Sequence, residues 1–125
     1  MQTTNNRTTV QLDEQKILDL IIDPRIAGIE KVVKRHYQVT TIVQLPNEGL
    51  NILIYLCIVI MPLDRRGIMA ILTDCYDLTE HRIMECAKAV FIKKETDKSF
   101  NLKVYQLYID YRQDLTNKEL KKVVA

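Results

Sequence analysis

The sequence predicts an all-α fold, a compact helical bundle formed by a single domain, and three observations support this prediction. The 125 residues suffice for one domain that buries a core without disulfides or metals. Hydrophobic residues make up 47% and charged residues 27% of the chain, which excludes a disordered or fibrous protein. Three glycines and three prolines are too few for the many tight turns of an all-β fold.

The first elements expected are a tail and two helices. We expect the polar residues 1–11, which lack the apolar stretch of a signal peptide, to form a flexible tail, and residues 12–125 to form the domain. The apolar residues of 13–22 predict a short helix that the Asp23-Pro24 pair ends. A second, amphipathic helix should begin near Pro24. Its apolar positions are Ile26, Ile29, Val32, Val33 and Tyr37.

The middle of the chain carries the longest apolar run, residues 50–61. Its length of about twelve residues favours a helix and is far too short to span a membrane. Its many β-branched residues leave a strand open as an alternative, with the β-branched residues 39–45 as the pairing partner. Residues 46–49, Pro-Asn-Glu-Gly, are typical of the loop that precedes this run.

Three further helices are expected. Asp64 is placed to N-cap a short helix with Ile68, Ile71 and Leu72 on its buried side, followed by a turn at residues 73–76. Asp77 and Glu80 resemble a capping box, so a helix should run from Leu78 to about Lys94. Its expected apolar stripe is Ile83, Cys86, Ala87, Val90 and Phe91. A last long helix over residues 97–114 has the stripe Phe100, Val104, Leu107, Tyr108 and Tyr111, and residues 118–124 end the chain.

The cysteines and histidines do not indicate catalysis or metal binding. Cys57, Cys75 and Cys86 are an odd number without a C-x-x-C pair, so we expect buried thiols in a reduced, intracellular protein. His36, His81 and the single serine form no catalytic pattern. We therefore expect no enzyme, no catalytic residue, no metal, no cofactor, no small-molecule substrate and no membrane partner.

A short helix, a turn and a longer helix form the pattern of a helix-turn-helix, whose second helix enters a DNA major groove. Thr79, His81 and Arg82 are free to face outward at the start of that second helix, with Lys88 further along. Arg82 suits a guanine edge, and His81 and Thr79 suit bases or phosphates.

The order of these elements resembles the C-terminal DNA-binding domain of the bacterial replication initiator DnaA over residues 24–111. Residues 28–39, GIEKVVKRHYQV, are similar to the family's opening helix, and residues 52–60 fall on its central helix. Residues 67–75 and 81–90 fall on its helix-turn-helix, with matching apolar positions at Ile83, Cys86 and Val90. The family's signature, close to GGRDHTTV, is replaced here by YDLTEHRI, and residues 44–49 lack the basic charge of the corresponding family loop.

The resemblance implies a stand-alone domain that binds double-stranded DNA, as suits a bacterial or bacteriophage replication protein. Thr79, His81 and Arg82 would then enter the groove, with Lys88 one turn further on, and Lys34, Arg35, Arg65 and Arg66 would hold the backbone. Residues 62–94 carry a net charge of only +1, which predicts weak binding. The alternative is a phage structural or protein-interaction module, with a protein partner or a second copy, that has lost DNA binding. We expect a cytoplasmic protein in the first case and a cytoplasmic or virion protein in the second.

Overall fold

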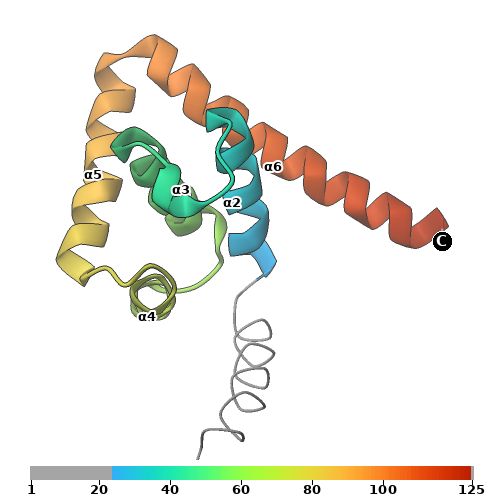
Figure 1. Cartoon of the computed structure of the whole chain (residues 1–125), viewed down its shortest axis with the longest axis horizontal. Helices are drawn as coiled ribbons and strands as arrows, with labels where there is room; N and C mark the ends of the chain where they lie inside the picture. Colours follow the sequence, from blue (N-terminus) through green and yellow to red (C-terminus); the bar gives the residue numbers. More distant parts are fainter. Residues whose placement is uncertain (1–23, 125) are drawn as a thin grey trace, which may run out of the picture.

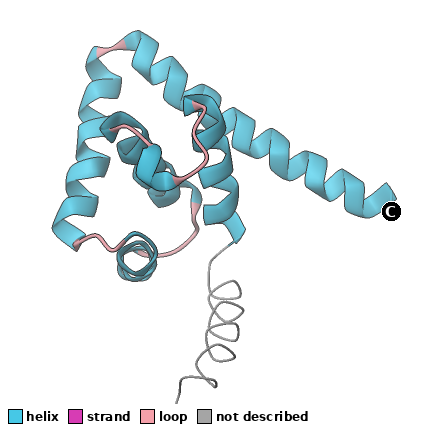
Figure 2. Cartoon of the chain, in the orientation of Figure 1, coloured by secondary structure: helices cyan, strands magenta, loops and turns pink. Residues whose placement is uncertain are grey.

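The computed structural model describes residues 24–124, with side chains for residues 24–120. Within this range every regular element is helical, as the sequence predicts, and short loops join the helices (Figure 2). The expected tail of residues 1–11 and the expected helix of residues 13–22 lie outside the described residues. The elements are α2 Pro24–Tyr37, the 3-10 turn η1 Ile42–Gln44, α3 Asn47–Ile60, α4 Arg65–Tyr76, α5 Glu80–Thr96 and α6 Lys98–Val124.

Helix α3 is the centre of the bundle and packs against α2, α4 and α5 (Figure 1). It is apolar on most of its circumference, and Ile52, Leu53 and Ile54 are fully buried in succession. A helix surrounded by partners can bury successive residues in this way. The prediction of a helix at residues 50–61 is therefore confirmed, and the strand alternative is wrong. The helix begins earlier than expected, at Asn47, so the prediction of a loop at residues 46–49 is wrong.

The core contains the apolar stripes expected of α2, α4 and α6, with Ile29, Val33 and Leu72 fully buried. Two expectations for the core are wrong. Phe91 is 57% exposed, because it lies about 100° around α5 from the buried Val90 and no described helix covers that side. Cys75 is exposed near the end of α4, whereas Cys57 and Cys86 are buried as expected.

Helix α6 is longer than the sequence analysis predicts. It follows α5 after a single residue, Asp97, whose carboxylate accepts a hydrogen bond from the Phe100 backbone N–H (3.1 Å). It then crosses α2 at Gly28, where a Cβ atom would lie 3.0 Å from the Tyr111 ring. The helix continues to Val124 instead of ending near Asp114, because neither glycine nor proline interrupts it. Figure 1 shows its C-terminal part extending beyond the other helices.

Two N-caps define where α4 and α5 begin. Asp64 accepts a hydrogen bond from the Gly67 N–H (2.8 Å), which confirms it as the N-cap of α4. Helix α4 continues through the predicted turn at residues 73–76, and the chain turns at Asp77, which has a left-handed backbone (φ 51°). Thr79 caps α5 by accepting a bond from the Arg82 N–H (3.1 Å), so the predicted start at Leu78 is wrong. A threonine hydroxyl next to the first helical residue supplies the acceptor that the Asp77–Glu80 pair was expected to provide.

Candidate nucleic-acid interface

Helices α4 and α5 are joined by residues 77–79 alone. In Figure 1, α4 is seen end-on while α5 lies lengthwise, so the two helices cross steeply. The Tyr76 hydroxyl donates a hydrogen bond to the Glu30 carboxylate of α2, which ties the end of α4 to the bundle. Burial of Tyr76, together with nearby negative charge, raises the pKa of its phenol well above the ordinary value, so it stays a donor. The turn and the start of α5 are thus fixed at the surface.

The predicted contact residues of α5 are all exposed. The Thr79 hydroxyl is the N-cap of α5, because it accepts a hydrogen bond from a backbone N–H of the first turn. Thr79 therefore holds the start of this helix. The His81 side chain is 84% exposed, and its Nε2 lies 3.6 Å from Glu85 Oε1, one turn along. Arg82 and Lys88 extend into solvent. Exposed pairs such as His81–Glu85 contribute little stability, so these side chains are free to rearrange around a ligand.

The four predicted backbone contacts come from two helices, α2 and α4. Arg65 and Arg66 are exposed in the first turn of α4. Lys34 and Arg35 lie in the last turn of α2, and Lys34 is one turn after Glu30, whose carboxylate accepts the hydrogen bond from Tyr76 of α4. There the Arg35 guanidinium pairs with Asp114 of α6 (3.2 Å). Arg65 and Arg66 thus belong to the α4–α5 pair itself, whereas Lys34 and Arg35 lie on the neighbouring helix α2.

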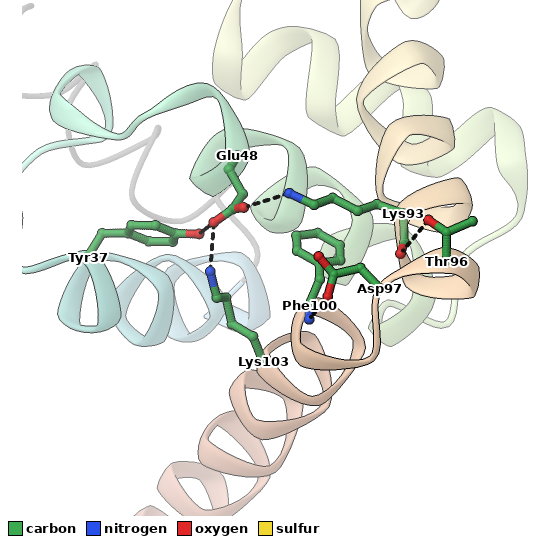
Figure 3. A network of polar contacts seen from close by, with 7 residues as sticks. All are labelled: Tyr37, Glu48, Lys93, Thr96, Asp97, Phe100 and Lys103. Atoms are coloured by element: carbon green, nitrogen blue, oxygen red, sulfur yellow. Dashed lines mark hydrogen bonds and ion pairs between the residues drawn. The ribbon is translucent and has the colours of Figure 1, made fainter.

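A polar junction that the sequence analysis does not predict lies at the opposite end of α5 (Figure 3). The Glu48 carboxylate, in the first turn of α3, accepts hydrogen bonds from the Tyr37 hydroxyl (2.6 Å), Lys103 Nζ (2.8 Å) and Lys93 Nζ (3.2 Å). These partners come from α2, α6 and α5. One carboxylate therefore connects four helices.

The electrostatics of this junction indicate a structural role. The hydrogen bond from Lys103, followed by that from Tyr37, lowers the pKa of Glu48 from 4.5 to about 2. Burial and the adjacent carboxylate raise the pKa of Tyr37 above the ordinary value of a phenol. At neutral pH Glu48 is a poor base and Tyr37 a poor nucleophile. Two of the ammonium groups also lie over aromatic rings, Lys93 over Phe100 (4.6 Å) and Lys103 over Tyr37 (5.9 Å).

Sequence provides one weak signal for this junction, an acidic residue in the first turn of a helix. The lysines that bind Glu48 are 45 and 55 residues away, so only the three-dimensional packing identifies them.

Comparisons with models of protein families, with curated proteins and with solved structures find no match to this chain. The resemblance to the DnaA domain therefore stays a prediction. Within the described residues, no group of three or more His, Cys, Asp or Glu side chains is arranged to hold a metal. No helix in residues 24–124 is long and apolar enough to cross a membrane.

Proposed function

We propose that this protein binds double-stranded DNA through α4 and α5, with the start of α5 in the major groove. The observation that supports this proposal is the fixed and exposed start of α5. The cap at Thr79 and the tie between Tyr76 and Glu30 hold the helix terminus in place, while His81 and Arg82 extend into solvent. The backbone N–H groups of such a terminus also favour a phosphate. The DnaA resemblance supports the same proposal and suggests a bacterial or phage replication setting.

The exposed side chains of α4 and α5 have two proposed roles in DNA binding. Arg82 is suited to pair with a guanine edge, and His81 and Lys88 lie beside it along the helix. Arg65 and Arg66, in the first turn of α4, are placed to hold phosphates of the strand that α4 crosses. This interface uses the cations of α4 and α5; Lys34 and Arg35 lie on α2, where Arg35 is paired with Asp114 of α6.

The charge of this surface predicts weak, salt-sensitive binding. Four cations, Arg65, Arg66, Arg82 and Lys88, are available for phosphates or bases, and Glu80 and Glu85 lie on the same part of α5. If four phosphates are neutralised, a plot of the logarithm of the binding constant against the logarithm of the salt concentration has a slope of roughly −3 to −4. The affinity should then fall roughly a hundredfold between about 50 mM and about 200 mM salt.

The proposal is tested by fluorescence anisotropy with a labelled duplex pool of mixed sequence at both salt concentrations. We expect binding at about 50 mM salt, a salt slope that Arg66→Ala makes shallower by about 1, and weaker binding for Arg82→Ala. The matched control is Arg112→Ala, an exposed arginine on α6, which should bind like the wild type. The absence of binding near 50 mM salt, or an equal loss for Arg82→Ala and Arg112→Ala, would contradict the proposal.

A second variant strengthens this test by making binding tighter. Glu85 is 55% exposed and its carboxylate faces His81, so it repels phosphates at the point where α5 should enter the groove. Glu85→Gln removes this charge and should increase the affinity several-fold at low salt. Glu119→Gln, on an exposed part of α6, is the control and should leave the affinity unchanged.

A protein-interaction module is the second candidate function, and the apolar outer side of α5 favours it. Met84, Phe91 and Ile92 are exposed on this helix, which is unusual for a surface that only contacts DNA. A second copy of the chain is the simplest partner to test. Light scattering should then show a dimer that Phe91→Ser converts to a monomer, and a wild-type monomer at every concentration would contradict association through this surface.

A further inference from the structure

A groove lies between the first half of α2 and the C-terminal half of α6, and no described helix covers it. It has a volume of about 600 Å³. Its floor includes Ala27, Gly28, Tyr111 and Leu115. Helix α6 crosses α2 at Gly28 and then extends beyond the other helices (Figure 1), and the groove lies beside this crossing. Leu115, which lines this groove, is 37% exposed.

The edges of this groove are mainly basic. Arg25, Lys31 and Lys118 are cations, and Asp114 is the only acidic residue among the described residues that line it. The Asp114 carboxylate is paired with Arg35. Lys31 and Lys118 have no ion pair with any described residue. The groove thus offers an apolar floor between positively charged edges, which suits an acidic, amphipathic segment.

The chain itself contains such a segment immediately before the groove. Residues 13–23, DEQKILDLIID, carry four acidic residues and one lysine, a net charge of −3. Ile17, Leu18 and Ile21 recur at helical spacing. The segment joins α2 at Pro24, and Pro24 lines the groove. A direct tether of this kind gives a high effective concentration, so even modest contacts suffice for docking.

We propose that residues 13–22 dock in the groove between α2 and α6 of the same chain, with Ile17, Leu18 and Ile21 against Tyr111 and Leu115. The lengths agree, because a helix of ten residues is about 15 Å long and the α6 part of the groove, residues 111–118, spans about 10 Å. Docking also covers the part of α6 that extends from the bundle, where an uncovered helix gains little stability from tertiary packing. The acidic residues of the segment face Lys31 and Lys118.

Limited trypsin digestion of the full-length chain tests this proposal. Lys16 is the only trypsin site between Arg7 and Arg25, and docking shields the adjoining peptide bond. Leu115→Glu places a charge on the groove floor at a partly exposed position, so the fold itself should tolerate it. We expect cleavage after Lys16 to become about tenfold faster in this variant, because proteolysis follows the population of the undocked form. Leu120→Glu, exposed on the same helix beyond the groove, is the control and should be cleaved like the wild type.

Disulfide trapping identifies the occupant directly. In a Cys75→Ser background, which removes the exposed native thiol, Leu18→Cys and Leu115→Cys should form a disulfide at the mass of one chain. The pair Leu18→Cys and Leu102→Cys should not form this disulfide. Leu102 is exposed on the N-terminal half of α6. Equal cleavage of Leu115→Glu and wild type, or disulfides formed only between two chains, would overturn the proposal.

Discussion

Replacing Glu48 by glutamine should destabilise the fold, because this carboxylate connects four helices through Tyr37, Lys93 and Lys103. Glutamine keeps the shape of the side chain and one acceptor oxygen, but it loses the negative charge that pairs with both lysines. The effect therefore measures the charge rather than the packing of the residue.

The magnitude follows from the pKa of Glu48. Lowering this pKa from 4.5 to about 2 corresponds to at most ~3 kcal/mol of stability for the charged form. About a third of the Glu48 side chain is exposed (32%), so solvent screening reduces the expected loss to ~1–2 kcal/mol. Because the folded-state pKa is lowered, this stability is fully present above pH 4.5 and is lost as the pH falls from 4.5 towards about 2.

Urea unfolding followed by circular dichroism measures this effect. At neutral pH the midpoint of Glu48→Gln should lie roughly 1 M below that of the wild type. The difference should shrink as the pH is lowered below 4.5, because the wild-type carboxylate becomes protonated. Glu119→Gln, at an exposed position with no ion pair among the described residues, should match the wild type at each pH. Equal midpoints for Glu48→Gln and wild type at neutral pH would refute the structural role of the junction.

Three further substitutions test the packing and the caps by urea unfolding. Leu53→Ala, at a fully buried position in α3, should cost about 2–5 kcal/mol, whereas Leu120→Ala at an exposed position should change stability by less than about 0.5 kcal/mol; similar effects would contradict the assigned core. Thr79→Ala should cost about 1 kcal/mol through the lost cap, and Thr79→Ser should retain most of that stability; an unaffected alanine variant would contradict the cap. Gly49→Ala should destabilise the fold despite a better helix propensity, because its Cβ would lie 3.2 Å from the Tyr37 ring; a stabilised variant would show that this contact relaxes.

The parts of the fold that local patterns determine could be predicted from the sequence. The apolar spacing of Ile26, Ile29 and Val33 predicts a helix because these residues share one face, and they are buried as expected. Asp64 could be recognised as a cap because capping depends on residues three positions apart. Periodicity did not reveal that Phe91 is exposed, because which side of α5 is covered depends on how α3 and α6 pack against it.

The candidate site could be predicted only in part. The exposed positions of His81, Arg82 and Lys88 follow from the helical period once Ile83 and Val90 are placed in the core. Neither the pairing of Arg35 with Asp114, 79 residues away, nor the Glu48 junction leaves a local pattern in the sequence. Contacts of this kind depend on which helix ends the fold brings together.

The most direct test of the proposed function is a nitrogen–proton correlation spectrum of the full-length chain titrated with duplex DNA at low salt. We predict that chemical-shift changes concentrate at residues 65–66 and 79–88, and that Arg82→Ala reduces them. Shift changes confined to Phe91, Ile92 and the first half of α6, or no change at saturating DNA, would contradict DNA binding through the start of α5.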